Sequence, residues 1–275
     1  MEIVVENLSY TYPGGVAALQ DVSLRIPPGE SLAIVGQNGA GKTTLVKHFN
    51  GLLQPGSGRV LVGDWDTRRR SVASLAAVVG YAFQNPDDQL FAATIWSEVI
   101  FGPKNLGWPE ERVDRMAKAA LDAVGLSHAA QVHPYDLPIG RRRLIALAAV
   151  LSMDTPVLIL DEPTTGLDYA GTELVGQIVE DLKLQGKTVI TVTHDIDFCA
   201  EHFARVLVMA GGRVLLDGPA RHALAQDAVL AQTYVDPPQL IRLARRLGLE
   251  QIPLDATEFL NAWSPLAERS EASRN

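Results

Sequence analysis

The sequence predicts an α/β fold built on a parallel sheet, and three observations lead to this prediction. Residues 157–160 and Thr188–Val192 are continuous apolar runs of strand length, as expected for strands buried on both faces of a parallel sheet. A helical pattern at 172–184 lies between these two runs. A further strand, Ser31–Val35, leads into a glycine-rich loop and then into a helix.

The N-terminal third is predicted to consist mainly of strands. Residues 2–8 are apolar and extended, and Pro13-Gly14-Gly15 signals a turn after them. Residues 27–30, which read PPGE, interrupt the chain directly before Ser31–Val35. Residues 59–62 form another strand, and a turn follows it.

The middle of the chain is predicted to be helical. Apolar residues recur at helical spacing over 109–124, with Gly125 as a C-cap, and a second helix covers 141–152. After the parallel strands, residues 206–209 and 214–216 flank a pair of glycines and are expected to form a hairpin.

From about Gly218 the chain changes character, and we expect a small helical extension over 218–275. Two short helices are predicted there, at 239–247 and at 255–263, and Pro237-Pro238 precedes the first of them. The polar end of the chain, 270–275, is expected to be frayed.

Composition narrows the classes of protein that fit. Of the 275 residues 47% are apolar, so the chain can bury a substantial core. The net charge of −8 argues against a nucleic-acid partner, which requires a basic face. Cys199 is the only cysteine, which excludes an intrachain disulfide. We expect neither a membrane-spanning helix nor a secretory leader, so any connection to a membrane has to come through a partner.

Residues 36–43 read GQNGAGKT, the pattern of a phosphate-binding P-loop between a strand and a helix. Its glycines let the backbone curl so that N–H groups point at phosphate oxygens, and the helix N-terminus adds a positive dipole. Lys42 is expected to place its ammonium on the β- and γ-phosphates, and Thr43 to offer its hydroxyl to Mg²⁺. The predicted nucleotide-binding residues are Gly36, Gln37, Asn38, Gly39, Ala40, Gly41, Lys42, Thr43 and Thr44.

A second nucleotide motif is an apolar strand that ends in two adjacent carboxylates, LILDE at 158–162. Asp161 is expected to hold Mg²⁺ through water, opposite Thr43. Glu162 is then placed to orient or deprotonate the water that attacks the γ-phosphate. Two carboxylates at a strand end can be ordinary acids, but the P-loop upstream favours catalysis, with ATP and Mg²⁺ as the ligands.

Several motifs occur in an order that resembles a known family. Residues 161–168 read DEPTTGLD, the P-loop lies upstream, and Thr193-His194-Asp195 lies downstream. With these motifs, residues 2–217 resemble the ATPase subunit of an ATP-binding cassette (ABC) transporter. The resemblance implies a P-loop NTPase fold, with a RecA-like core, an antiparallel β subdomain and a helical subdomain inserted at about 84–152.

The functional positions of the family match particular residues of this chain. Tyr12 lies where the family stacks an aromatic ring on adenine, with Tyr10 as a second candidate. Gln84 resembles the glutamine that reaches Mg²⁺ and the attacking water and that links the site to the membrane subunit. His194 resembles the switch histidine that contacts the γ-phosphate. Asp168 resembles the D-loop acid that crosses to the second subunit of the dimer.

The segment that begins at Gln84 is similar to the energy-coupling-factor (ECF) group of importers, in QNPDDQLF at 84–91 and FGPKNLG at 101–107. The stretch PPQL at 237–240 resembles the helical extension of their ATPases. These importers take up vitamins such as biotin or transition-metal ions such as cobalt and nickel. The resemblance implies a second ATPase subunit, a transmembrane coupling protein, a separate substrate-binding membrane protein, and a place on the cytoplasmic face of the membrane.

In this group the coupling protein docks a helix into a groove on each ATPase. Apolar residues of the segment are candidates for the wall of that groove, and the alternative is that they are core of the helical subdomain: Leu90, Phe91, Ile95, Trp96, Val99, Ile100 and Phe101. Asp87 and Asp88 are candidates for meeting a basic residue of the docking helix.

One departure from the family concerns the signature loop, which usually reads LSGGQ and here reads LPIGR, from Leu137 through Pro138, Ile139 and Gly140 to Arg141. This loop normally crosses the dimer and gives a serine hydroxyl and N–H groups to the γ-phosphate of the other subunit, but Pro138 has neither group. We expect the contact to be weakened, not lost, because the helix N-terminus survives and Arg141 adds positive charge. An alternative is that the loop is tuned to this form, with Arg141 replacing the lost donors.

The sequence therefore predicts an ATP-hydrolysing subunit of an ECF-type importer, two of which sandwich two Mg·ATP. A soluble ABC ATPase is one alternative, and the acidic net charge argues against a role on nucleic acid. A poorly hydrolysing regulatory subunit is another, favoured by the altered signature loop and opposed by Glu162 and His194. Neither the transported substrate nor the choice between homodimer and heterodimer follows from the sequence.

Overall fold

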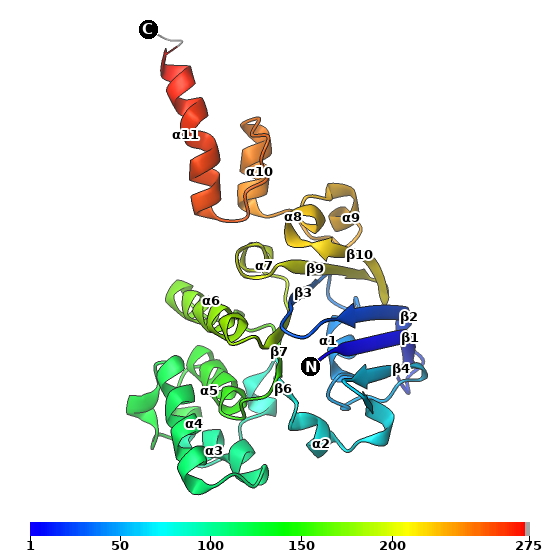
Figure 1. Ribbon diagram of the computed structural model, residues 1–275, viewed down its shortest axis with the longest axis vertical. Helices are drawn as coiled ribbons and strands as arrows, with labels where there is room; N and C mark the ends of the chain where they lie inside the picture. The colour runs from blue at the N-terminus through cyan, green and yellow to red at the C-terminus, as the bar shows by residue number, and fades with distance from the viewer. Residues whose placement is uncertain (273–275) are drawn as a thin grey trace.

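The computed structural model describes residues 1–272, and the side chains of residues 1–264. Two sheets lie next to one another, with helices packed beside them and a pair of helices standing away at the C-terminal end (Figure 1). No helix within the described residues is both long and apolar enough to span a membrane.

The N-terminal sheet is antiparallel and has the strand order β2-β1-β4-β5. Its strands are β1 (Ile3–Thr11), β2 (Ala17–Ile26), β4 (Ser57–Val62) and β5 (Trp65–Asp66). The strand β2 was missed from the sequence, although Val22, Leu24 and Ile26 alternate with exposed residues and are buried. This sheet carries Tyr10 and Thr11, so that Tyr12 follows directly at its end.

The central sheet confirms the predicted parallel arrangement, with the order β10-β9-β3-β8-β7-β6. The strands β9, β3, β8, β7 and β6 pair with their neighbours in parallel, and only β10 pairs antiparallel, with β9. The strands are β3 (Ser31–Val35), β6 (Val79–Ala82), β7 (Val157–Asp161), β8 (Thr188–Val192), β9 (Arg205–Ala210) and β10 (Arg213–Pro219). Because β3, β6, β7 and β8 run in parallel, their carboxyl ends meet at one edge, where ligands bind in sheets of this kind.

Two apolar cores lie on opposite faces of this sheet. Leu158 and Leu160 of β7 pack into the core shared with the helices, whereas Val157 and Ile159 pack into the core shared with the N-terminal sheet. All five residues of β3, of β7 and of β8 are buried. The strands that carry the site are therefore fixed from both faces.

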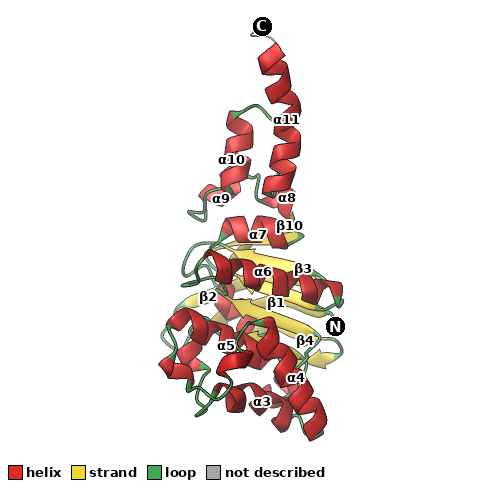
Figure 2. Cartoon of the chain, turned by 90° about the vertical axis from the view of Figure 1, so that its left-hand side faces the viewer, coloured by secondary structure: helices red, strands yellow, loops and turns green. Residues whose placement is uncertain are grey.

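The helical part lies beside the free edge of β6 (Figures 1 and 2). It holds α3 (Ile95–Asn105), α4 (Glu110–Ala123) and α5 (Ile139–Leu151), and α5 begins two residues before its predicted start. The helix α3 was not predicted; a capping box between Thr94 and Ser97 starts it. The other helices before β10 are α1 (Lys42–Lys47), α2 (Val72–Ala76), α6 (Tyr169–Leu184), α7 (Ile196–His202) and the short turns η1 (Thr67–Arg69), η2 (Pro86–Asp88), η3 (Ser127–Ala129) and η4 (Pro134–Asp136).

The C-terminal part contains α8 (Ala220–Ala223), α9 (Asp227–Ala231), α10 (Gln239–Arg246) and α11 (Ala256–Ala272), and α10 and α11 stand side by side away from the sheets (Figure 2). The predicted helix 255–263 is too short, because α11 extends from Ala256 to Ala272. The expected fraying from residue 270 is not seen up to Ala272, and residues 273–275 lie outside the described residues. β10 continues to Pro219, two residues past the predicted domain boundary, and the division at 217 stays a prediction.

Candidate active site

The phosphate loop follows β3 and ends where α1 begins at Lys42. Gly36, Gly39 and Gly41 all have positive φ, and Gly41 is the N-cap of α1. A Cβ on Gly36 would lie 2.1 Å from the Met209 carbonyl oxygen, and one on Gly41 would lie 2.5 Å from that of Ala18. Glycine is therefore required at both positions, and the loop has the curled form that cradles phosphate.

Lys42 lies across this loop. Its ammonium donates to the carbonyl oxygens of Gly36 at 2.6 Å and of Gln37 at 3.1 Å, and its side chain is buried. Burial lowers the pKa of Lys42, while the carboxylates of Glu162 and Asp161 raise it. A cation is thus held against the phosphate loop, which suits the charge of a triphosphate.

Asp161 ends β7 opposite the start of α1. Its Oδ1 accepts a hydrogen bond from the Thr43 hydroxyl at 3.2 Å, and its Oδ2 accepts one from the Tyr81 hydroxyl at 2.6 Å. Burial raises the pKa of Asp161, whereas the bonds from Tyr81 and Thr43 lower it. Tyr81, on the neighbouring strand β6, was missed from the sequence; its only signal is a hydroxyl within an otherwise apolar strand.

Glu162 and His194 meet beside the loop, as predicted from the motifs. The Glu162 carboxylate is buried, and its Oε2 lies 2.8 Å from Nδ1 of the exposed His194. The hydroxyl of Thr193 donates to the same oxygen at 3.3 Å, and that of Thr165 at 3.5 Å. Glu162 itself has a φ of 52°, a left-handed conformation that is unusual for a residue other than glycine.

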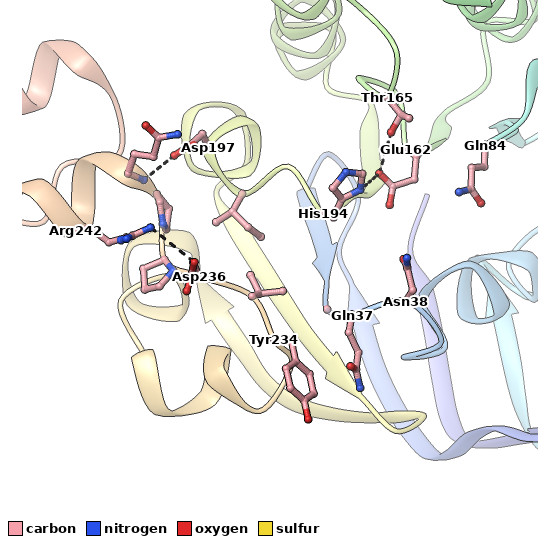
Figure 3. A pocket seen from close by; sticks show the side chains of 16 residues that line it. Gln37, Asn38, Gln84, Glu162, Thr165, His194, Asp197, Tyr234, Asp236 and Arg242 are labelled. Atoms are coloured by element: carbon pink, nitrogen blue, oxygen red, sulfur yellow. Dashed lines mark hydrogen bonds and ion pairs between the residues drawn. The ribbon is translucent and has the colours of Figure 1, made fainter.

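A cavity of about 590 Å³ opens in front of these groups. Figure 3 shows Glu162, His194 and Gln84 around it, with Asn38 of the phosphate loop pointing toward them, and Gln37 also lines the cavity. The segment from Tyr234 to Arg242 lines its other side, which was not foreseen from the sequence. The structure therefore brings the predicted catalytic residues Lys42, Gln84, Glu162 and His194 into one place.

The signature and D-loop residues form a separate surface. Pro138 is the N-cap of α5 without a side-chain cap bond, and Ile139, Gly140 and Arg141 are its first three residues. Asp168 caps α6 and accepts a bond from the Gly171 N–H at 2.8 Å. Both helix starts line a cavity of about 410 Å³ that shares no lining residue with the first cavity. Leu137 is half-buried against the core.

Comparison with known proteins agrees with these motifs. The sequence model of a family described as ABC transporter matches residues 19–165. The chain is 44% identical over 244 residues to the cobalt import ATP-binding protein CbiO of Rhodobacter capsulatus, across 88% of this chain and 87% of that protein. It is 36% identical to the energy-coupling factor transporter ATP-binding protein EcfA of Methanocaldococcus jannaschii, across 92% of each protein.

The chain belongs to the ABC transporter ATP-binding family. Among these proteins it groups with the ATPases of energy-coupling-factor transporters and of cobalt import. A solved structure of CbiO1 from Clostridium perfringens, described as part of the ABC transporter complex cbiONQ, matches with a TM-score of 0.74 and 36% identity, over 90% of this chain and 98% of that one. This chain spans 44% of the length of a putative ABC transporter ATP-binding protein of Methanosarcina acetivorans, to which it is 40% identical.

In this ABC cassette the aromatic pair near the phosphate loop distinguishes Tyr12 from Tyr10. Tyr12 is 37% exposed, and its hydroxyl lies 3.1 Å from that of Thr44. Tyr10 is half-buried between the rings of Tyr12 and His48, each with its centroid 5.0 Å away. Tyr12 therefore offers the more accessible ring to a base, and its role on adenine stays a prediction.

In the segment 84–101 of the cassette, here called the docking segment, most of the apolar candidates belong to the core. Leu90, Ile95, Val99 and Ile100 are buried and Trp96 is half-buried, so the groove expectation is wrong for the four buried residues. Phe91 and Phe101 are exposed by 63% and 49%, with ring centroids 4.7 Å apart. The sequence could not separate the two groups, because helix periodicity does not say which apolar face a neighbour covers.

The acids of the docking segment also differ from expectation. Asp87 is already paired within the chain, because Nη1 of Arg142 lies 2.8 Å from its Oδ1. Asp88 is exposed and forms no ion pair in the part of the chain that is described. Of the two predicted docking acids, only Asp88 is therefore free of an ion pair with the described residues.

Arg143 follows Arg142 on α5. It donates to the Glu162 carbonyl oxygen at 2.5 Å, a contact that the sequence did not indicate.

Proposed function

We propose that the chain is the ATP-hydrolysing subunit of an ECF-type importer for cobalt, nickel or a vitamin. The observation that carries this proposal is the buried Glu162 carboxylate, held 2.8 Å from His194 beside the phosphate loop. The relative of Rhodobacter capsulatus is named for cobalt import, which favours a transition-metal ion as the transported substrate.

The nucleotide would lie along the loop Gly36–Thr44, with its base on Tyr12 and its β- and γ-phosphates under Lys42. Thr43, Asp161 and Gln84 would hold Mg²⁺, with Asp161 acting through water. The fit is supported by the 3.2 Å contact between Thr43 and Asp161, because Mg²⁺ prefers oxygen ligands of this kind. When bound, the ion would neutralise the charge on the phosphates.

Glu162 would act as the general base. Its Oε2 is occupied by His194, Thr193 and Thr165, whereas its Oε1 has no hydrogen-bond partner in the described part of the chain. Oε1 can therefore accept the proton of a water in the cavity while that water attacks the γ-phosphorus of ATP. ADP and phosphate leave, and His194 and Gln84 orient the water and the γ-phosphate.

Two such subunits would be needed for a complete site, because the signature surface does not reach the chain's own phosphate loop. In the homodimer or heterodimer, residues 137–141 and Asp168 of one subunit would cover the nucleotide of the other. A transmembrane coupling protein would contact Phe91 and Phe101 on the cytoplasmic face of the membrane, and a separate membrane protein would bind the substrate. A poorly hydrolysing regulatory subunit is the second candidate, because Pro138 removes a hydroxyl and an N–H.

Replacing Glu162 with Gln tests hydrolysis directly. We expect kcat of the full chain to fall by about 100-fold or more, while nucleotide affinity stays within about threefold. Phosphate release and nucleotide binding are measured side by side, with Glu173→Gln, an exposed carboxylate on α6, as the control. Turnover within about threefold of wild type would remove Glu162 as the general base.

A further inference from the structure

The N-terminal end of α5 carries three consecutive arginines, Arg141 to Arg143. Cations at this end oppose the helix dipole, so the helix itself stabilises none of the three charges. The Arg141 side chain is exposed and forms no ion pair or hydrogen bond with the described residues, whereas Arg142 pairs with Asp87. Arg143 turns inward instead, to the residue that we propose as the general base.

The contact of Arg143 is made to the backbone of Glu162, not to its carboxylate. Nη1 of Arg143 donates to the Glu162 carbonyl oxygen at 2.5 Å. The Nε atom of the same guanidinium is buried and has no hydrogen-bond partner in the described residues. The Nε atom of Arg142 is unpaired in the same way, so the bond to Glu162, and not the unpaired donor, distinguishes Arg143 from its neighbour.

The backbone at Glu162 needs support, because its φ of 52° is unfavourable for a residue with a side chain. Its N–H donates to the Val192 carbonyl of β8 at 2.7 Å, which fixes one side of the residue. The bond from Arg143 fixes the other side from α5. Because the peptide groups on both sides of Glu162 are held, its Oε2 can contact His194 while its Oε1 stays free beside the cavity.

The helix that carries Arg143 is itself held in place. The amide nitrogen of Gln89 donates to the Ala146 carbonyl of α5 at 2.8 Å, and its oxygen accepts from the Phe83 N–H at 3.1 Å. The Leu144, Ile145 and Leu147 side chains of α5 are buried in the core. Arg143 therefore reaches Glu162 from a rigid element, as a positioning contact requires.

We propose that Arg143 is a positioning residue for hydrolysis, which fixes the strained backbone of Glu162 so that its carboxylate faces the attacking water. This role rests on the proposed function, because it assumes that Glu162 is the general base. Arg143 itself does not touch the nucleotide in this role, so its loss should change the chemical step and leave nucleotide binding intact.

The test compares Arg143→Gln and Arg143→Lys in the full chain, with Arg142→Gln as the control. Arg142 is the adjacent residue on the same helix and loses the same charge, but its partner is Asp87. We expect Arg143→Gln to lower kcat about 10- to 100-fold, with KM for ATP and nucleotide affinity within about twofold. Arg143→Lys should recover part of kcat, because it keeps one charged donor, and Arg142→Gln should keep kcat within about twofold.

Thermal unfolding of each variant shows whether the fold is kept. The proposal is overturned if Arg143→Gln keeps kcat within about twofold of wild type, or if kcat and nucleotide affinity fall together. It is also overturned if Arg142→Gln loses as much turnover as Arg143→Gln. An inactive Glu162→Gln with a fully active Arg143→Gln would contradict only this inference, whereas a fully active Glu162→Gln would contradict the proposed function itself.

Discussion

The two surfaces that are proposed to face nucleotide in this chain differ in how closely they keep the residues of the ABC family. The phosphate-loop surface keeps each predicted residue, and the structure gathers Lys42, Gln84, Glu162 and His194 there. The signature surface keeps two of its five usual residues, Leu137 and Gly140. In the proposed function the first surface contains the groups that perform the chemistry, and the second would contribute to the site of a neighbouring subunit through a helix N-terminus.

The structure gives a physical reason for this difference. Side chains at the phosphate loop are confined, since a Cβ on Gly36 would lie 2.1 Å from the Met209 carbonyl. Ile139 at the signature surface is 42% exposed, so its side chain can change without disturbing the core. The positive end of α5 is a property of its backbone and persists when side chains change. A position on these surfaces therefore tolerates substitution when its side chain is exposed and when the backbone alone supplies the contact that is needed.

The largest effect should come from a single methyl group on the phosphate loop. Gly36→Ala places a Cβ against the Met209 carbonyl at a φ of 145°, so we expect a cost of at least about 3 kcal/mol in the nucleotide-bound loop. Nucleotide affinity of the full chain should fall more than about 100-fold, as measured by titration with a fluorescent ATP analogue.

Ile139→Ala on the signature surface is the matched change, and it should leave the nucleotide affinity of the isolated subunit within about twofold. The predicted difference between the two surfaces would be contradicted if both variants bound nucleotide with the same affinity, or if Ile139→Ala bound it more weakly than Gly36→Ala.

A much smaller effect is expected from a contact between α8 and α11 in the C-terminal extension, and the two residues that form this contact line neither of the two cavities. Arg221 and Glu258 form a two-point contact between α8 and α11, with nitrogen–oxygen distances of 2.7 and 2.9 Å. Since both side chains are partly exposed, water screens the pair, and Glu258→Gln should destabilise the fold by about 1 kcal/mol or less. Thermal unfolding should show a shift of a few degrees at most, with nucleotide affinity unchanged.

This contact also predicts a pH dependence. The hydrogen bond from Arg221 lowers the pKa of Glu258 in the folded chain. Its contribution to stability is therefore present above the unfolded pKa of about 4.3 and is lost as the pH falls through the folded value. The difference in unfolding temperature between wild type and Glu258→Gln should thus vanish in acid. A change of nucleotide affinity in Glu258→Gln would instead show that the contact between α8 and α11 is coupled to the phosphate-loop surface, whose cavity residues 234–242 of the same extension line.

What the sequence could predict was local. The strand, loop and helix around Gly36–Thr43, the strand that ends in Asp161, and the strand before His194 are contiguous patterns, and the structure confirms them as β3, β7 and β8. Parallel strands then bring their carboxyl ends to one edge, so the meeting of Glu162 with His194 also followed from the pattern.

What the sequence could not predict was contact between distant segments. The bond from Tyr81 to Asp161 and the bond from Arg143 to Glu162 join residues of different elements and leave no periodic signal. The pairing of Asp87 with Arg142 could not be predicted for the same reason. Asp87, an expected docking acid, is instead paired within the chain. The roles of the site residues on nucleotide and Mg²⁺ stay predictions, because geometry alone places groups without showing what they bind.

The measurement that tests the difference between the surfaces most directly is ATP turnover per subunit of the full chain as a function of its concentration. Wild type is compared with Pro138→Ser/Ile139→Gly and with Arg141→Gln. The double replacement returns an N–H, a hydroxyl and a closer approach to phosphate, a contact of about 1.5–3 kcal/mol. If the signature surface is weakened, the double variant should dimerise more tightly on ATP and turn over about tenfold faster or more at low concentration, with Arg141→Gln changing little. Unchanged or reduced turnover in the double variant, together with a large loss of turnover in Arg141→Gln, would contradict a weakened signature surface. It would show that Arg141 replaces the lost donors.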